Sequence, residues 1–157
     1  MKKFLVLVLA LVGMTTMTQA QTKGDMEAGV QFAYGTGDSY SNVGIGAKFR
    51  YTVVDNVRIE PSFTYFLKKD YVSMWDVSAN AHYLFGLNDR FTLYPLAGIG
   101  ITGVKVGDAS DSEFGVNLGG GVDYDLSQNL VLNGELKYKI GGDWDRLIIS
   151  VGVTYKF

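Results

Sequence analysis

The 157-residue sequence predicts an all-β fold, an eight-stranded antiparallel up-and-down barrel. Apolar residues recur at every second position through most of the chain, which is typical of strands with one apolar face. Helical spacing, in which apolar residues return every three or four positions, is missing. Short segments rich in Asn, Asp and Gly separate the alternating stretches, as turns between antiparallel strands do.

The first twenty residues differ from the rest of the chain. A basic start (residues 1–3) precedes an apolar run (residues 4–12) and a small, polar stretch that ends in Ala20. This order is that of a secretory signal peptide with cleavage after Ala20. The apolar run is too short for a membrane-spanning helix, which needs about 20 residues. We therefore expect residues 1–20 to be a cleaved signal peptide and residues 21–157 to form one exported barrel domain.

The last segment shows the alternation most clearly. Its odd-numbered positions from Leu147 to Phe157 are apolar, and its even-numbered positions after Ile148 are polar or glycine. Only Ile148 breaks the rule. Seven earlier segments follow the same pattern. The eight expected strands are residues 28–34, 43–51, 57–67, 75–85, 91–101, 114–126, 130–140 and 147–157.

Alternation alone does not say which face of a barrel points inward. A soluble barrel or a two-sheet sandwich buries its apolar face, whereas a membrane barrel turns an apolar band to lipid and packs polar groups inside. Strands of about 11 residues at 3.3 Å per residue, tilted near 45°, span roughly 26 Å, which is the height of a bilayer barrel's apolar band. Soluble strands are usually about 5 or 6 residues long. Strand length therefore favours a transmembrane β-barrel.

Aromatic residues on the apolar faces gather near the strand ends. Threading the chain up and down places one group at the short-turn end and another at the long-loop end, with Val, Ile, Leu and Ala between them. Two aromatic girdles at the membrane interfaces are typical of outer-membrane barrels. The expected girdle residues are Tyr34, Tyr51, Tyr65, Trp75, Tyr83, Phe85, Phe91, Phe114, Tyr124, Tyr138 and Tyr155.

The polar faces carry basic and acidic residues in nearly equal number, with glycines between them. The interior of an eight-stranded barrel is only wide enough for side chains, so opposite charges can pair across it while glycines make room. If the polar faces were on the outside of the barrel and exposed to water, they would need neither a balance of opposite charges nor the glycines. The expected lumen charge network is Lys48, Arg50, Arg58, Glu60, Asp123, Glu135 and Lys137.

The connections between strands alternate in length. Residues 53–56, 86–90 and 127–129 are expected to be tight turns, and residues 36–41, 68–72, 104–112 and 141–145 are expected to be looser loops. Outer-membrane barrels have short periplasmic turns and longer extracellular loops. We therefore expect both chain ends to lie in the periplasm.

The C-terminal residues resemble a known signal. Ser150, Gly152, Tyr155 and Phe157 supply a polar residue, a glycine two positions later, an aromatic residue third from the end and a terminal Phe. This segment resembles the outer-membrane assembly signal, and residues 21–157 resemble small eight-stranded barrels of the OmpA/OmpX type. The resemblance implies a Gram-negative outer-membrane location and recognition by the barrel assembly machinery. Adhesins of this type raise long loops or a protruding sheet, so the short loops expected here count against an adhesin role.

Two motif matches are expected to form no site. Residues 98–103 read G-x-G-x-x-G, but a dinucleotide site needs a helix to begin there and a polar loop follows instead. Residues 108–113 carry carboxylates and hydroxyls suited to weak Ca²⁺ binding, yet they lack the twelve-residue ligand pattern of an EF-hand. We therefore expect barrel-wall glycines and an ordinary solvated loop, with no bound metal and no cofactor.

His82 is the candidate catalytic base. Ser78, Asn80 and His82 share one strand face, on which positions four apart lie about 13 Å from each other. A Ser-His-acid triad, as in lipid-modifying barrels, would need residues from other strands, for instance Asp123 or Glu60. We expect His82 to belong to the lumen network and to have no catalytic role.

Composition excludes several function classes. The absence of Cys excludes thiolate metal sites and catalytic thiols, and a single His excludes a multi-His zinc site. A net charge of −2 argues against nucleic-acid binding.

We expect a monomeric, non-enzymatic outer-membrane barrel with a plugged lumen and a structural or surface-interaction role, in contact with outer-membrane lipid and lipopolysaccharide. A narrow pore for ions or small solutes is the first alternative, and a lipid-modifying enzyme is the second.

Overall fold

The computed structural model describes residues 22–37, 41–142 and 145–157. The expected signal peptide, residues 1–20, lies outside this described part of the chain. No helix in the described ranges is long and apolar enough to cross a membrane.

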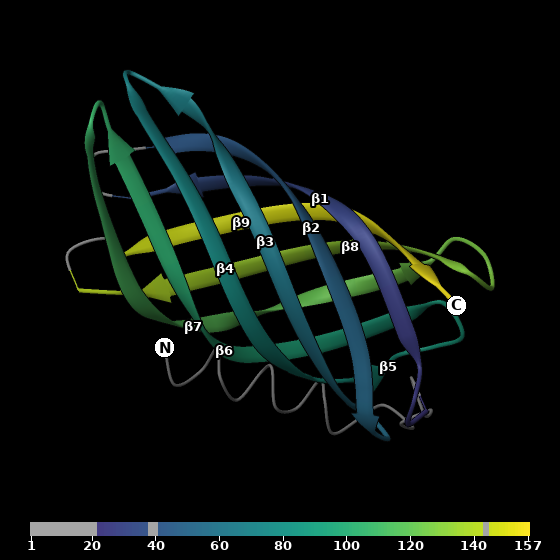
Figure 1. The fold of residues 1–157 in the computed structure, drawn as a ribbon. Helices are drawn as coiled ribbons and strands as arrows, with labels where there is room; N and C mark the ends of the chain where they lie inside the picture. Colours follow the sequence, from purple (N-terminus) through teal and green to yellow (C-terminus); the bar gives the residue numbers. More distant parts are fainter. Residues whose placement is uncertain (1–21, 38–40, 143–144) are drawn as a thin grey trace, which may run out of the picture.

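The described residues form one antiparallel sheet of nine strands that closes on itself (Figure 1). β1 pairs with both β2 and β9, and β4 pairs with both β3 and β6. The short β5 follows β4 after a break at Leu84 and also pairs with β6, so β4 and β5 together make one strand of the barrel. The expected eight-stranded antiparallel barrel is therefore confirmed. The strands are β1 (Met26–Thr36), β2 (Ser41–Val54), β3 (Val57–Lys69), β4 (Val72–Tyr83), β5 (Phe85–Gly86), β6 (Phe91–Val106), β7 (Ala109–Asp125), β8 (Leu130–Ile140) and β9 (Arg146–Lys156).

The barrel buries its polar face and exposes its apolar face. On β3, Arg58 and Glu60 are at most 1% exposed, whereas Ile59 and Phe63 are 43% and 48% exposed. The same inversion holds along every long strand, except at the protruding ends of β6 and β7, where residues 105–112 are all exposed. Such an arrangement is unfavourable in water, because it leaves large apolar side chains hydrated and charges desolvated. In hydrocarbon it is the favourable arrangement, since the apolar band then meets lipid.

Two small apolar clusters interrupt the polar interior. Ile148, the residue that breaks the alternation of β9, packs with Ala33, Phe66 and Met74. At another place in the interior, Leu84, Tyr94 and Leu96 form a second buried cluster. Leu84 lies in the break between β4 and β5, and each of the other residues occupies an inward position of its strand. In these strands the two faces still alternate, and only the residue type differs from the polar interior.

Two of the four expected long loops are hairpin turns instead. β3 and β4 are joined by Asp70 and Tyr71, which both have positive φ, and β6 and β7 are joined by Gly107 and Asp108. The expected loops at residues 68–72 and 104–112 are therefore wrong. The strands continue there although their outward faces are no longer apolar. Val72 and Val104 pack against the apolar cluster that contains Phe66 and Met74, and the pairing of β6 with β7 runs without interruption to Val106 and Ala109.

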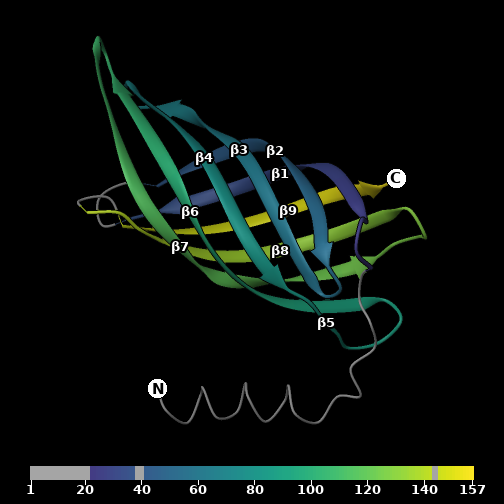
Figure 2. The same cartoon turned by 60° about the horizontal axis from the view of Figure 1, so that its bottom comes forward.

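The extended hairpins project beyond the rest of the barrel wall. β6 has 16 residues and β7 has 17, compared with 11 in β8 and 11 in β9. In Figure 2 the β6–β7 hairpin reaches farthest from the barrel, with the β3–β4 hairpin beside it. The pairing of β4 with β6 continues to Val72 and Val106, so the two hairpins form one protruding sheet.

Candidate functional site: a buried ionic lumen

Five charged side chains meet inside the barrel and form what we call the lumen charge cluster. They are Glu27, Arg50, Arg58, Glu60 and Asp123, contributed by β1, β2, β3 and β7, and none is more than 4% exposed. Inward alternation places each of them in the lumen, and the closed sheet brings β7 opposite β2 and β3. Three acidic and two basic side chains therefore share one buried centre.

Arg50 is the hub of the lumen charge cluster. Its Nε donates to Glu60 Oε2 at 2.6 Å, and its Nη1 donates to Glu27 Oε2 and to Asp123 Oδ1, each at 3.2 Å. Its Nη2 donates to the Tyr94 hydroxyl at 3.2 Å. Three carboxylates and one hydroxyl thus satisfy a guanidinium that is fully buried. A planar, five-donor group is suited to such multiple contacts, whereas a lysine is not.

Arg58 supplies the second cation of the cluster. Its Nη1 lies 2.9 Å from Asp123 Oδ2 and 3.8 Å from Glu27 Oε1, and its guanidinium lies 4.9 Å from the centre of the Tyr94 ring. Its Nε and Nη2 lie 3.2 and 3.0 Å from His82 Nδ1. Asp123 therefore bridges the two arginines.

Tyr94 links the cluster to Glu135. Its hydroxyl accepts the bond from Arg50 and donates to Glu135 Oε2 at 3.0 Å, while its ring stacks on His82 with centroids 4.4 Å apart. Tyr94 is absent from the network expected from the sequence. Its position between the outward Leu93 and Pro95 could have identified it, because strand alternation then directs its side chain inward.

Within the described part of the chain, five of the seven residues of the expected network form ion pairs with one another or with Glu27, and the other two do not. Arg50, Arg58, Glu60 and Asp123 lie together, and Lys48 Nζ lies 3.9 Å from Glu60 Oε2. Among the described residues, neither Glu135 nor Lys137 makes an ion pair. Both occupy inward positions of β8, and the carboxylate of Glu135 accepts a hydrogen bond from the Tyr94 hydroxyl instead.

A second polar cluster lies on β4, β6, β7 and β8. Lys139 pairs with Asp76, whose carboxylate also accepts from Ser78 Oγ at 2.6 Å and from Thr102 Oγ1 at 2.8 Å. Asn117 donates to Ser78 Oγ at 3.2 Å and extends the network across the lumen. Asp76 and Lys139 both stand on polar strand faces, but the sequence contains no signal that pairs them.

Glu60, His82 and Glu135 are the residues nearest to a metal-ligand set. They place one potential ligand atom each within 4.8 Å of one another. Arginine has no acceptor, so its bonds to His82 Nδ1 require a lone pair there, and the proton of the neutral ring lies on Nε2. Neither ring nitrogen is then free to bind a metal ion, and the geometry does not support a metal site.

His82 is also separated from the serine with which it shares a strand face. Ser78 Oγ donates to Asp76 and accepts from Asn117, and both contacts belong to the second polar cluster. His82 instead contacts Arg58 and Tyr94. A Ser-His-acid triad needs a serine hydroxyl within hydrogen-bond reach of the ring, and these two side chains are bound elsewhere.

Comparison with protein families identifies the chain. The family model described as "Outer membrane protein beta-barrel domain" matches residues 4–157. The chain belongs to this family. No protein of curated function is significantly similar to it.

Solved structures show the same fold for this outer-membrane barrel. The N-terminal β-barrel domain of Pseudomonas aeruginosa OprF has a TM-score of 0.71 at 20% identity, over 87% of this chain and 100% of that one. Ail, the attachment invasion locus protein of Yersinia pestis, has a TM-score of 0.64 at 20% identity over 87% and 100%. Neisserial surface protein A has a TM-score of 0.65 at 17% identity over 85% and 96%. These identities establish a shared fold and nothing finer.

The structure places the expected girdle residues of this outer-membrane barrel on its outer surface. All eleven are exposed or half-buried. At the short-turn end, the ring centroids of Tyr83 and Phe85 are 4.8 Å apart, as are those of Phe91 and Tyr124. Toward the other end, Tyr65 pairs directly with Trp75. Their role at the two membrane interfaces stays a prediction.

The residues of the expected assembly signal divide between the two faces of β9. Ser150 and Gly152 point inward and are buried, whereas Tyr155 and Phe157 are exposed on the outer surface with rings 6.5 Å apart. A Cβ at position 152 would lie 2.6 Å from the Val30 carbonyl oxygen, so close strand contact requires glycine there. Recognition of this segment by the assembly machinery stays a prediction.

Proposed function

We propose that this chain is a monomeric structural barrel of the outer membrane whose lumen is closed by its own side chains and whose protruding sheet binds a partner at the cell surface. Residues 1–20 serve as its export signal. Both ends of the barrel domain lie in the periplasm, on the side of the short turns. The opposite girdle and hairpins face lipopolysaccharide and the exterior.

The observation that carries a closed lumen is the contact of Arg50 with Asp123 across it. Arg50 Nη1 and Asp123 Oδ1 are 3.2 Å apart, and Tyr94, Glu27 and Glu60 surround the same guanidinium. Removing one partner of a buried ion pair costs about 3–5 kcal/mol, so thermal opening of the whole cluster is rare. A barrel sealed in this way conducts no ions.

Planar-bilayer recording tests the closed lumen. The purified, folded full-length domain is added to a planar bilayer and the current is followed under an applied voltage. We expect no single-channel steps above the baseline of detergent alone. Steady, reproducible steps from the native protein would support the pore instead.

A specific feature of the interior favours the narrow pore as the rival function. Several buried side-chain atoms make no hydrogen bond within the described residues, among them Gln31 Oε1, Lys48 Nζ, Asn80 Nδ2 and His82 Nε2. Buried polar atoms are normally satisfied by protein or by ordered water. Water beside these atoms would form a partial path through the lumen, which the lumen charge cluster interrupts in the closed barrel.

The surface role rests on the protruding sheet. Residues 109–112 of β7 pair with β6 on one side and with no described strand on the other, because pairing with β8 begins only at Val116. All four residues are exposed. A free strand edge binds an extended peptide through main-chain hydrogen bonds. The likeness to a protein named for attachment and invasion supports such a role, and the short loops expected from the sequence no longer oppose it.

Shortening the hairpin tests the surface role. Val104 pairs with Asp111, so residues 105–110 can be replaced by Asn-Gly without a change of register. Cells that display the native barrel should adhere to surfaces coated with matrix or serum protein, and cells with the shortened hairpin should not. Ser110→Ala, which keeps the edge, serves as the control at equal surface abundance. Equal adhesion by the native and shortened proteins would contradict the proposal.

A further inference from the structure

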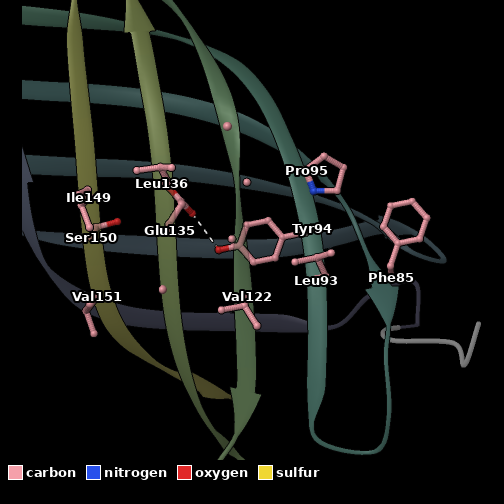
Figure 3. Close-up of a pocket in the computed structure, with 14 residues that line it drawn as sticks. Phe85, Leu93, Tyr94, Pro95, Val122, Glu135, Leu136, Ile149, Ser150 and Val151 are labelled. Atoms are coloured by element: carbon pink, nitrogen blue, oxygen red, sulfur yellow. Dashed lines mark hydrogen bonds between the residues drawn. The ribbon is translucent and has the colours of Figure 1, made fainter. Parts of the chain in front are cut away.

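A groove of about 750 Å³ is hollowed into the outer wall of the barrel across β6, β7, β8 and β9. Figure 3 shows the side chains that line it. The outward residues along its sides are apolar, among them Leu93, Pro95, Leu136 and Val151. This surface is part of the exposed apolar band, so the groove opens to the hydrocarbon of the membrane.

Two outward-facing glycines create the groove. Gly120 pairs with Leu136 on β8, and one outward row farther along, Val122 pairs with Gly134. The two glycines therefore lie diagonally to each other on neighbouring strands, and neither has a side chain that would fill the outer surface there. A Cβ added at Gly134 would meet only Val122 Cγ1, at 4.0 Å, so no neighbouring side chain fills the space above this glycine.

The floor of the groove carries Tyr94, Glu135 and Ser150, which occupy inward positions of their strands. Behind the glycines, the Tyr94 hydroxyl donates to Glu135 Oε2 at 3.0 Å, as Figure 3 shows. The same hydroxyl also accepts from Arg50 Nη2. Both side chains are thus engaged with the lumen. An occupant of the groove must be apolar, slender and long enough to cross two strands.

An exposed arginine stands beyond the short-turn end of the groove. Arg90 Nη1 lies 3.3 Å from the Tyr124 hydroxyl, and Tyr124 is the next outward residue of β7 after Val122, about 7 Å along the strand. In the described part of the chain no carboxylate forms an ion pair with Arg90. The carboxylate of Asp125 pairs with Lys156 instead, at 3.1 Å. An apolar groove with a cation at its interfacial end matches an acyl chain joined to an anionic headgroup.

We propose that the groove binds one glycerophospholipid of the leaflet at the short-turn end. One acyl chain lies over Gly120 and Gly134, between Leu136 and Val122. The phosphate lies beside Arg90, whose guanidinium provides a charge-assisted contact at the membrane interface. The site is a specific lipid position on the outer wall and requires neither an open lumen nor the protruding sheet.

Filling the groove tests the acyl-chain position. The delipidated native barrel in detergent micelles is titrated with dioleoylphosphatidylglycerol, and bound lipid is counted by native mass spectrometry. Gly134→Leu places a side chain in the groove without a backbone clash and should weaken binding of the first lipid at least fivefold. Ala79→Leu adds the same side chain at an outward position of β4 and should leave the binding unchanged. Equal binding by Gly134→Leu and the native barrel would overturn the proposal.

Two further measurements test the headgroup and the occupant. Arg90→Gln should weaken binding of the same lipid severalfold, and Arg90→Lys should retain most of it. A phosphatidylglycerol with a photoreactive acyl chain should label the peptides around residues 120–136 in the native barrel and not in Gly134→Leu. Labelling spread evenly around the barrel would exclude a specific site. A native dimer that Gly134→Leu converts to monomer would show that a second copy fills the groove, which also overturns the proposal.

Discussion

Arg50 and Asp123 come from opposite walls of the barrel and meet at its centre, with Nη1 3.2 Å from Oδ1. Three strands separate β2 from β7 in either direction around the sheet. The contact therefore joins two walls that share no backbone hydrogen bonds. Because the outer surface is solvated by lipid, specific packing within this barrel comes from charged and polar side chains rather than from an apolar core.

Asp123→Asn should destabilise the barrel strongly. Asp123 neutralises Arg50 and Arg58 together, and both guanidiniums stay buried when its charge is removed. Loss of one partner from a buried pair predicts a decrease of about 3–5 kcal/mol in the free energy of unfolding, measured by urea titration in lipid vesicles. Asp125→Asn is the matched control. Its ion pair with Lys156 is about one-third exposed, so the expected loss is below about 1 kcal/mol. Similar losses in the two variants would refute a central role for Asp123.

Arg50→Ala should open a conducting path. The substitution removes one of the two fully buried arginines of the lumen charge cluster and leaves Glu27, Glu60 and Asp123 around a wider, anionic lumen. We expect cation-selective steps in planar bilayers from folded Arg50→Ala and none from the native barrel. Heat-modifiable mobility on gels checks that the variant is folded. A folded but silent variant would show that other side chains close the lumen.

Gly121→Ala and Gly134→Ala should differ although the two glycines are close neighbours. A Cβ at Gly121 would overlap the Tyr94 hydroxyl and lie 2.7 Å from the Gly134 carbonyl oxygen, whereas a Cβ at Gly134 has room. Overpacking costs about 1–3 kcal/mol, so Gly121→Ala should lower the midpoint of urea unfolding while Gly134→Ala leaves it nearly unchanged. The reverse order would mean that Tyr94 moves aside at little cost.

His82→Ala should leave lipid A and phospholipid composition unchanged. The ring of His82 is bound by Arg58 and stacks on Tyr94, and it is 1% exposed, so no lipid reaches it in the closed barrel. The measurement is mass spectrometry of lipids from cells that express the native or the variant protein at equal abundance. A lipid species present only with the native protein would establish catalysis.

Strand number and the identity of each face were predictable from the sequence. Period-two alternation depends only on neighbouring residues, so it can be read directly, and even Ile148 keeps its inward position in the structure. The balance of charge on the polar faces also indicated which face turns inward. Two hairpins were mispredicted as loops because polar residues replace the apolar face there. The Gly107-Asp108 pair between β6 and β7 is a two-residue hairpin signal that could have corrected the prediction for that hairpin.

The sequence by itself determined that this protein is a barrel with an apolar outer surface and a charged interior. Neighbouring residues of a strand point to opposite faces, so the residue types at alternate positions define both faces. Only the tertiary structure decided which charges meet. Arg50 and Asp123 are 73 residues apart, and their contact depends on how the sheet tilts and closes. The same holds for Gly120 and Gly134, which are ordinary glycines in sequence. Strand register sets them diagonally on one outer surface and so hollows a groove there.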